Sequence, residues 1–251
     1  MPHTGHILHG RYAVVSCHVE RPLDDEVWRR FRSFQQRRPG GFAIAALMRP
    51  PAAGEEEARW LERAREAEAC GPFGLHTHWT APDHARPTGG GADPADLVRE
   101  QGRWLSSVGL EATLFCGGGW YFDERVADAV ADLGYADCTA TAFRPAYLAP
   151  DAPHLQLAEP SWLELAGGRR LLELPTTHSI GMLARTLFAR SPGDQILHAY
   201  FHDTDLLDRR RSAALRVALA VLRLRRTPSD LNELQRGLRP EKTMSFANKR
   251  P

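Results

Sequence analysis

The sequence is short of lysine and carries no strong net charge of either sign. Lys242 and Lys249 are its only lysines, so arginine supplies nearly all of the positive charge. Its 32 basic and 31 acidic residues leave a formal net charge of +1. Such a chain has no overall electrostatic attraction to nucleic acid or to anionic lipid. We therefore expect no nucleic-acid partner, and any charged ligand must be bound by a local group of side chains.

We expect neither a membrane-spanning segment nor an export signal. The longest apolar runs, such as residues 42–48, are far shorter than the roughly 20 residues that cross a bilayer. The first ten residues, MPHTGHILHG, lack the basic segment followed by an apolar one that an export signal requires. We expect a cytoplasmic protein with no membrane span.

Cysteines are too few and too widely spaced for a disulfide scaffold or a zinc finger. They stand 53, 46 and 22 residues apart and form no C-x-x-C pair: Cys17, Cys70, Cys116 and Cys138. We expect all four to be free thiols.

What the sequence does contain is an alternation of apolar runs typical of strands with segments whose apolar residues recur at helical spacing. Seven apolar runs have the length and composition of strands: residues 12–19, 42–48, 75–79, 112–116, 136–141, 170–174 and 195–202. Helical spacing follows most of them, with helices beginning near residues 24, 55, 93, 123 and 208. This alternation predicts a single parallel α/β domain, and a distorted (β/α)7 barrel is favoured over an open doubly wound sheet.

The remaining segments are expected to lie outside this regular pattern. The predicted barrel covers residues 11–226, between a flexible N-terminus at 1–10 and a frayed C-terminal tail at 227–251. Residues 143–168 are rich in proline and show no clear period, which predicts a long loop over one end of the sheet. The arginine-flanked helix at 208–226 could lie on a membrane surface, but its apolar side favours packing on the barrel.

Histidines collect at or just after the ends of the predicted strands. The five in such positions are His18, His76, His78, His178 and His202. In parallel α/β folds the carboxyl ends of the strands lie on one face, where ligands bind. Several imidazoles near Glu20, Asp83 or Asp205 have the composition of a site for zinc or another divalent transition metal.

The segment GLHTHWTAPDHARP concentrates this signal. In a strand, His76 and His78 would project from the same face, so both imidazoles could bind one ion. His84 could return to the same point from the loop that follows. Two imidazoles on one face with a third six residues later favour metal binding over a structural role.

Five segments resemble, in the same order, motifs of the polysaccharide deacetylase superfamily (NodB-like, carbohydrate esterase family 4). Residues 74–79 resemble its histidine motif, and FCGGGW at 115–120 resembles its F-R-x-G-x-W motif. The other three are residues 12–20, where the family's first strand ends in an acidic pair, the helix at 123–135 ending in L-G-Y, and the final strand ending at 200–202 in a catalytic histidine. The resemblance spans most of residues 12–225.

This resemblance implies a distorted (β/α)7 barrel that uses a divalent metal to remove N-acetyl groups from amino sugars. It implies a metal bound by an aspartate and two histidines, a carboxylate general base and a histidine general acid. On that basis His202 is expected as the acid, with Asp205 orienting it, and Glu20 as the base. The expected metal ligands are His18, His76 and His78, with His84 in reserve. Zinc is the first candidate ion, and Co²⁺, Ni²⁺ and Mn²⁺ are alternatives.

Three departures from the family pattern stand out. The segment Cys17-His18-Val19-Glu20 lacks the usual aspartates, Cys116 replaces the expected arginine, and Thr80 occupies the usual place of the second histidine. Cys116 could be a metal ligand, a nucleophile or, most simply, a buried inert thiol. Residues expected to contact a substrate are Trp79, Trp120, Cys116 and His178.

These observations leave three functions open. The first is metal-dependent de-N-acetylation of a small N-acylated amino sugar or related metabolite. The second is an amidase acting on a non-sugar amide. The third is a catalytically silent barrel that serves as a binding or regulatory protein, having lost the acidic pair and the arginine.

Overall fold

A computed structural model describes residues 11–80, 91–186 and 196–246 of the chain. Its strands are β1 (Tyr12–Val19), β2 (Ile44–Met48), β3 (Phe73–Thr77), β4 (Leu114–Gly117), β5 (Ala136–Asp137), β6 (Ser161–Glu164), β7 (Arg170–Glu173), β8 (His178–Ser179), β9 (Ile196–His202), β10 (Thr227–Pro228) and β11 (Thr243–Ser245). Its α-helices are α1 (Asp25–Arg37), α2 (Glu57–Cys70), α3 (Pro94–Ser107), α4 (Glu124–Asp132), α5 (Ile180–Thr186), α6 (Arg209–Arg225) and α7 (Leu231–Gly237). Short 3-10 helices are η1 (Pro39–Gly41), η2 (Gly118–Trp120), η3 (Ala166–Gly168) and η4 (Asp203–Leu206).

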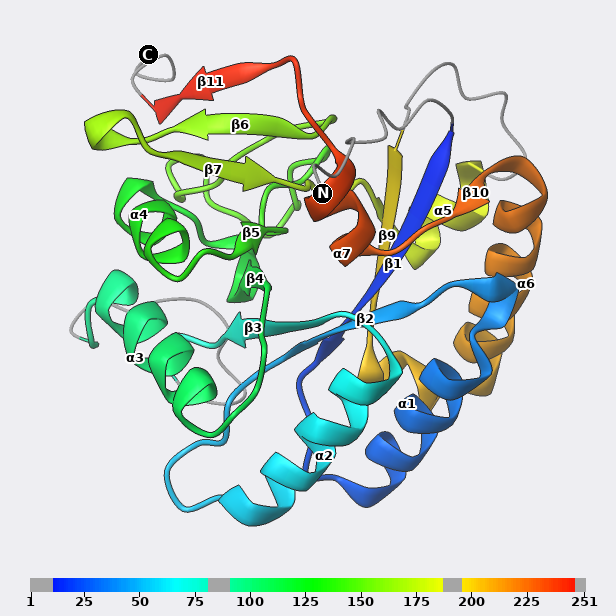
Figure 1. Cartoon of the computed structure of the whole chain (residues 1–251). Helices are drawn as coiled ribbons and strands as arrows, with labels where there is room; N and C mark the ends of the chain where they lie inside the picture. Colours follow the sequence, from blue (N-terminus) through cyan, green and yellow to red (C-terminus); the bar gives the residue numbers. More distant parts are fainter. Residues whose placement is uncertain (1–10, 81–90, 187–195, 247–251) are drawn as a thin grey trace, which may run out of the picture.

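All the strands belong to one curved sheet in the order β11-β6-β7-β5-β4-β3-β2-β1-β9-β8, with β10 paired to β1 (Figure 1). Every pairing is parallel except that of β6 with β7. Among the described residues the two ends of the sheet, β8 and β11, do not pair with each other. The predicted barrel-like parallel α/β fold is confirmed, and its sheet is open.

Aspartates begin most of the long helices. The side chains of Asp24, Asp93, Asp123 and Asp208 each accept hydrogen bonds from backbone N–H groups in the first turn of a helix. Each therefore satisfies donors that have no partner within the helix. The predicted starts of these helices are confirmed to within a residue or two.

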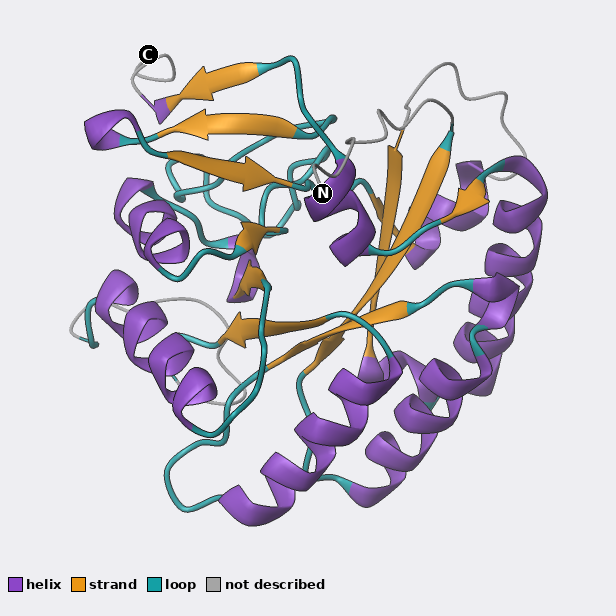
Figure 2. Ribbon diagram, in the orientation of Figure 1, coloured by secondary structure: helices purple, strands orange, loops and turns teal. Residues whose placement is uncertain are grey.

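The two faces of the sheet bury different sets of side chains. One face packs under the surrounding helices (Figure 2). Phe31, Phe34 and Trp60 are fully buried there. The other face lines the interior of the barrel, where Val14, Leu114 and Cys116 belong to one cluster. Alternation along β1 divides Ser16 and His18 from Cys17, because successive side chains of a strand point to opposite faces.

The C-terminal tail differs from the frayed segment that was expected. Its helix α7 buries Leu231 and Leu234 against Val14 and Ile196, so it closes the end of the barrel where β1 and β9 begin. Beyond α7, β11 pairs with β6. Leu231 and Leu234 anchor this segment, since residues three apart share one face of a helix.

The proline-rich segment 143–168 also differs from the predicted continuous loop. Its last part forms β6 and η3, and β6 pairs antiparallel with β7. A four-residue strand is too short to show a clear period in the sequence, and the pairing with β7 stabilises it. The predicted strands at 75–79 and 136–141 are also displaced or shortened, so His78 and Trp79 follow β3 and do not lie within it.

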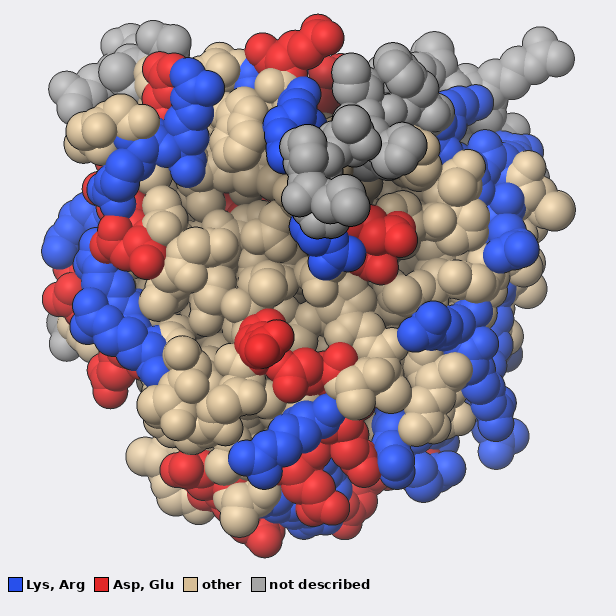
Figure 3. Space-filling model, in the orientation of Figure 1, with Lys and Arg blue, Asp and Glu red and all other residues tan. Residues whose placement is uncertain are grey.

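Helix α6 packs on the barrel as predicted. It buries Leu215, Ala218, Leu219 and Leu222, while its arginines lie mainly on the outside. Blue side chains accordingly line the edge of the molecule where α6 lies (Figure 3). None of the helices in the described ranges has both the length and the apolar character needed to cross a bilayer. The four cysteines are free thiols, as expected.

Candidate active site

Four imidazoles and one carboxylate meet at the carboxyl ends of β1, β3 and β9. His18 and His202 are direct partners in the parallel register of β1 and β9, and Glu20 follows β1. His76 lies in β3 and His78 follows it directly. Five of the predicted site residues, which the sequence separates by up to 184 positions, are thus neighbours here.

Glu20 lies at the centre of this cluster. Its Oε1 atom is 3.5 Å from His202 Nε2, 3.8 Å from His78 Nε2 and 3.9 Å from His76 Nε2. Two ligands of one tetrahedral zinc ion lie about 3.4 Å apart, given metal–ligand bonds of about 2.0–2.2 Å. The atoms therefore need only small movements to bind one ion.

His18 occupies the inner side of the cluster among aromatic rings. Its ring centroid is 4.5 Å from that of His76, 5.0 Å from Tyr200 and 5.2 Å from Trp120. The residue is only 3% exposed. Aromatic walls of this kind keep water away from the inner imidazoles.

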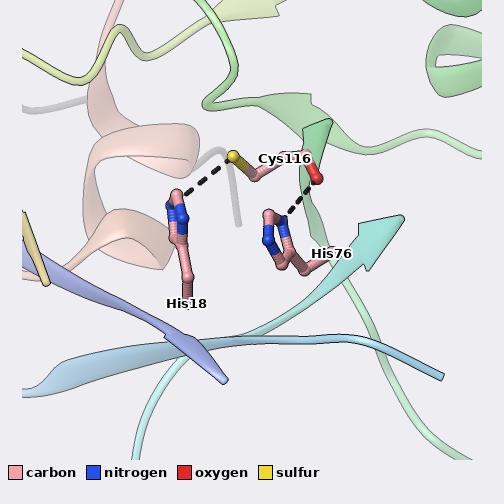
Figure 4. Close-up of side chains that lie close together, drawn as sticks. All are labelled: His18, His76 and Cys116. Carbon is pink, nitrogen blue, oxygen red and sulfur yellow. Dashed lines mark hydrogen bonds between the residues drawn. The ribbon is translucent and has the colours of Figure 1, made fainter. Parts of the chain in front are cut away.

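Cys116 completes the inner side. Its Sγ lies 3.5 Å from His18 Nε2, and its carbonyl oxygen lies 2.9 Å from His76 Nδ1, as Figure 4 shows. Because a carbonyl can only accept, Nδ1 of His76 carries a hydrogen, which leaves Nε2 as the nitrogen that can bind an ion. His76 is thereby oriented with one nitrogen available to a ligand.

The protonation states differ between the inner and outer parts of the cluster. Burial alone raises the pKa of Glu20, but His76, His202 and His78 together lower the pKa of this carboxylate to about 2. By contrast, burial lowers the pKa of His18, and the neighbouring histidines lower it further. Burial and then the charge of Asp137 raise the pKa of the Cys116 thiol. A neutral thiol beside a neutral imidazole is not an activated nucleophile.

His202 is supported from behind by a carboxylate. Its Nδ1 lies 3.8 Å from Asp205 Oδ2, which also accepts a 2.9 Å hydrogen bond from the His202 backbone N–H. Arg211 Nη1 donates to the other oxygen of Asp205 at 2.8 Å. Burial lowers the pKa of His202, but Asp205 and Glu20 outweigh it, so the net pKa is raised.

No family model and no curated protein matches the sequence. Solved structures do match. A 4-alpha-glucanotransferase from Thermococcus litoralis has a TM-score of 0.59 at 11% identity, over 95% of this chain and 42% of that one. A CE4 family pseudoenzyme from Bacillus anthracis has a TM-score of 0.51 at 12% identity, over 95% of this chain and 70% of that one. A mutant of that pseudoenzyme with restored enzymatic activity has a TM-score of 0.53 at 11% identity, over 94% of this chain and 70% of that one.

The fold of this chain is similar to that of these CE4 family structures. The resemblance drawn from the motifs is thus confirmed at the level of the fold, while identities of 11–12% do not establish the activity. The chain spans less than half of the glucanotransferase, so that protein's activity says nothing direct about this one.

Among the residues that the structure describes, two groups of side chains could hold a metal. We call Glu20, His76 and His78 the outer group, and His18, His76 and Cys116 the inner group. In each, the potential ligand atoms lie within 4.8 Å of one another. Two imidazoles and a carboxylate are a usual donor set for zinc, so the residues of the outer group fit the metal that the fold implies.

The glycine-rich turn after β4 is built for close backbone approach. A Cβ atom on Gly117 would collide with the carbonyl oxygen of Tyr121. Trp120 adopts a left-handed backbone, with φ at 62°, and non-glycine residues at such angles are often found at functional sites. Trp79 donates its indole N–H to Gly118 O at 2.9 Å and packs on Tyr121. Trp79 therefore supports this turn.

One other predicted residue lies in the strand next to β9, and two cannot be placed. His178 lies in β8, with Nδ1 2.8 Å from Thr177 Oγ1. His84 lies outside the described residues, as does Asp83.

Three residues with roles at the site were missed. Tyr200 and His198 precede His202 by two and four positions in β9, so a period of two would have placed them on the same face. His198 Nε2 lies 2.8 Å from Ser16 Oγ and forms a polar layer below the cluster. Arg49, just after β2, donates to the Glu20 carbonyl at 2.7 Å and pairs bidentately with Glu55. Only the position of Arg49 at the end of a predicted strand could have indicated a role at the site.

Proposed function

We propose that this chain is a metal-dependent hydrolase of the CE4 type that removes the acyl group from an N-acylated amino sugar or a related small metabolite. The observation that carries the proposal is the position of Glu20. One of its oxygens lies 3.5–3.9 Å from three imidazole nitrogens at the carboxyl ends of the strands.

In this proposal Glu20, His76 and His78 hold the metal, and zinc is the first candidate. A bound divalent ion would polarise the amide carbonyl and lower the pKa of a water molecule. Glu20 was expected to act as the base, but we assign it here as a metal ligand. The reason is that its oxygen lies 3.5–3.9 Å from three imidazole nitrogens, close to the separation of two ligands of one ion. His18 belongs to the inner group.

His202 is the proton-transfer residue of the proposed reaction. Its Nε2 faces the outer group, and Asp205 lies behind its Nδ1. This arrangement fixes the ring and favours the protonated form, which can protonate the departing amine. Arg211 positions Asp205 and needs no contact with the substrate.

The mouth of the cluster is partly open to solvent. The side chains of Glu20 and His202 are 30% and 36% exposed, whereas Trp120 is only 4% exposed. Trp120 and Tyr200 stack edge-to-face with centroids 4.9 Å apart. We propose that a sugar ring enters beside Glu20 and His202 and that this aromatic pair forms the wall, as aromatic faces suit the apolar faces of sugars.

Metal content and acetate release from N-acetylated amino sugars and their oligomers test the proposal together. The wild-type protein should contain a stoichiometric transition metal and release acetate. Glu20→Gln should lose most of the metal, whereas a base role would leave the metal in place and abolish turnover alone. Glu164→Gln is the matched control, because Glu164 lies in β6, is exposed to solvent and pairs with Arg170.

A catalytically silent barrel is the second candidate function. It is favoured by Cys116 in the place of the motif's arginine and by the absence of the acidic pair. The likeness to a protein described as a CE4 family pseudoenzyme is compatible with it. A folded protein that binds amino-sugar oligomers but releases no acetate with any divalent metal would support this function and contradict hydrolysis.

A further inference from the structure

Cys116 faces two imidazoles in the buried interior of the barrel. It is the partner of His76 in the register of β3 and β4, and it meets His18 across the barrel interior. The three residues are 0–3% exposed. The curvature of the sheet therefore brings a sulfur atom and two nitrogens together in a space that water reaches poorly.

The distances suit a metal ion. A zinc-bound sulfur and a zinc-bound nitrogen lie about 3.6 Å apart, given bonds of about 2.3 Å and 2.0–2.1 Å. Cys116 Sγ and His18 Nε2 are 3.5 Å apart. His76 is already oriented by the hydrogen bond between its Nδ1 and the Cys116 carbonyl.

The donors of the inner group select ions differently from those of the outer group. Thiolate and imidazole favour soft ions such as Cu⁺ and Cd²⁺, whereas a carboxylate suits harder ions. We propose that His18, His76 and Cys116 form a second metal site, selective for soft ions, on the inner side of the outer group. An ion that binds there replaces the thiol proton, which leaves to solvent, and forms a metal–sulfur bond.

The two groups cannot both be filled with their full set of ligands. Each needs His76, whose Nδ1 is engaged by the Cys116 carbonyl, so only Nε2 remains to bind an ion. A soft ion in the inner group therefore withdraws His76 from the outer group. This consequence rests on the proposed function, but the inner site itself does not.

Titration of the metal-free protein with Cd²⁺ tests the inner site without any activity assay. Cadmium bound to a thiolate has an ultraviolet charge-transfer absorption that nitrogen and oxygen ligands do not produce. The wild-type protein should show this band saturating at one equivalent. Cys116→Ser should lose the band and bind Cd²⁺ at least about tenfold more weakly. Cys116→Ala, checked by circular dichroism for a native fold, guards against misfolding of the serine variant.

Cys17→Ser is the matched control. Cys17 is also fully buried and precedes His18 in β1. It belongs to the hydrophobic core between the sheet and the helices, so it faces away from the barrel interior. The control should keep the band. A band that survives both Cys116 variants, or no band in the wild-type protein, would overturn the inner site.

The outcome is separable from that of the proposed function. A cadmium band without any hydrolysis leaves the inner site standing and removes the enzyme. Metal-dependent hydrolysis without a cadmium band would support the enzyme and overturn the inner site.

Discussion

The inner and outer groups differ in depth, charge and type of donor although they share His76. The inner group is closed, has sulfur and nitrogen donors, and holds a neutral thiol beside a neutral imidazole. In the outer group Glu20 is ionised and 30% exposed. A few ångströms of depth in one barrel therefore separate chemistry suited to soft ions from chemistry suited to hard ions.

The physical origin of the difference is solvation. Burial disfavours the charged form of any group, so a fully buried thiol keeps its proton and a buried imidazole stays neutral. Glu20 escapes this rule because three imidazoles surround its oxygen, and their attraction outweighs the cost of burial. The comparison yields four predictions, ordered from the largest effect to the smallest.

Removal of the shared ligand should disable both groups. His76→Ala is expected to weaken metal binding by at least about 10²-fold and to abolish both turnover and the cadmium band. Glu20→Gln should impair only the outer group and keep the band. Metal content after dialysis and chelator competition measure the affinity. Full metal retention by His76→Ala would show that neither group is a metal site.

Loss of His202 should affect only chemistry on the outer side. His202→Ala is expected to reduce turnover by roughly 10² to 10⁴-fold, which is the usual contribution of one acid–base group. Its metal content and cadmium band should match those of the wild-type protein, since His202 belongs to neither group. Unchanged turnover would remove His202 from the mechanism.

A methyl group at Gly117 should disturb the turn that follows Cys116. Gly117→Ala is expected to destabilise the fold by roughly 1–3 kcal/mol, because the new Cβ collides with the backbone of Tyr121. Gly181→Ala is the control, since its Cβ would meet nothing within 4 Å. Urea denaturation of the two variants measures the difference, and equal stabilities would contradict the close approach.

The smallest effect is expected on the pH profile. Asp205 helps to raise the pKa of His202, so Asp205→Asn should lower it. Because the acid must be protonated, the alkaline limb of turnover should move to lower pH. The same raised pKa contributes stability that is present below the ordinary pKa of histidine and is lost as pH rises through the raised value. In Asp205→Asn the stability should therefore fall less as the pH rises through this range.

Asp208→Asn is the control for the pH profile. Asp208 caps α6 and asparagine caps helices equally well, so neither the fold nor the profile should change. An Asp205→Asn profile identical to that of the wild-type protein would show that Asp205 does not influence His202.

The strand ends were the part of the site most open to prediction from the sequence. Each of His18, His76 and His202 follows a β-branched or apolar run, and parallel strands bring such residues to one edge. The positions of Glu20 and Arg49 were less accessible, because they follow strands and depend on how the chain turns afterwards. The contact of Cys116 with His18 joins residues 98 positions apart and has no local signal.

The sequence by itself determined the alternation of strands and helices, the aspartate caps, and the position of the histidines at one face of the sheet. These follow from side-chain periods and backbone hydrogen bonding over a few residues. Only the tertiary structure decided that α7 closes the barrel, that β6 and β11 extend the sheet, and that Glu20 lies among three imidazoles. Those outcomes depend on the curvature of the sheet, which arises from packing between segments far apart in the chain.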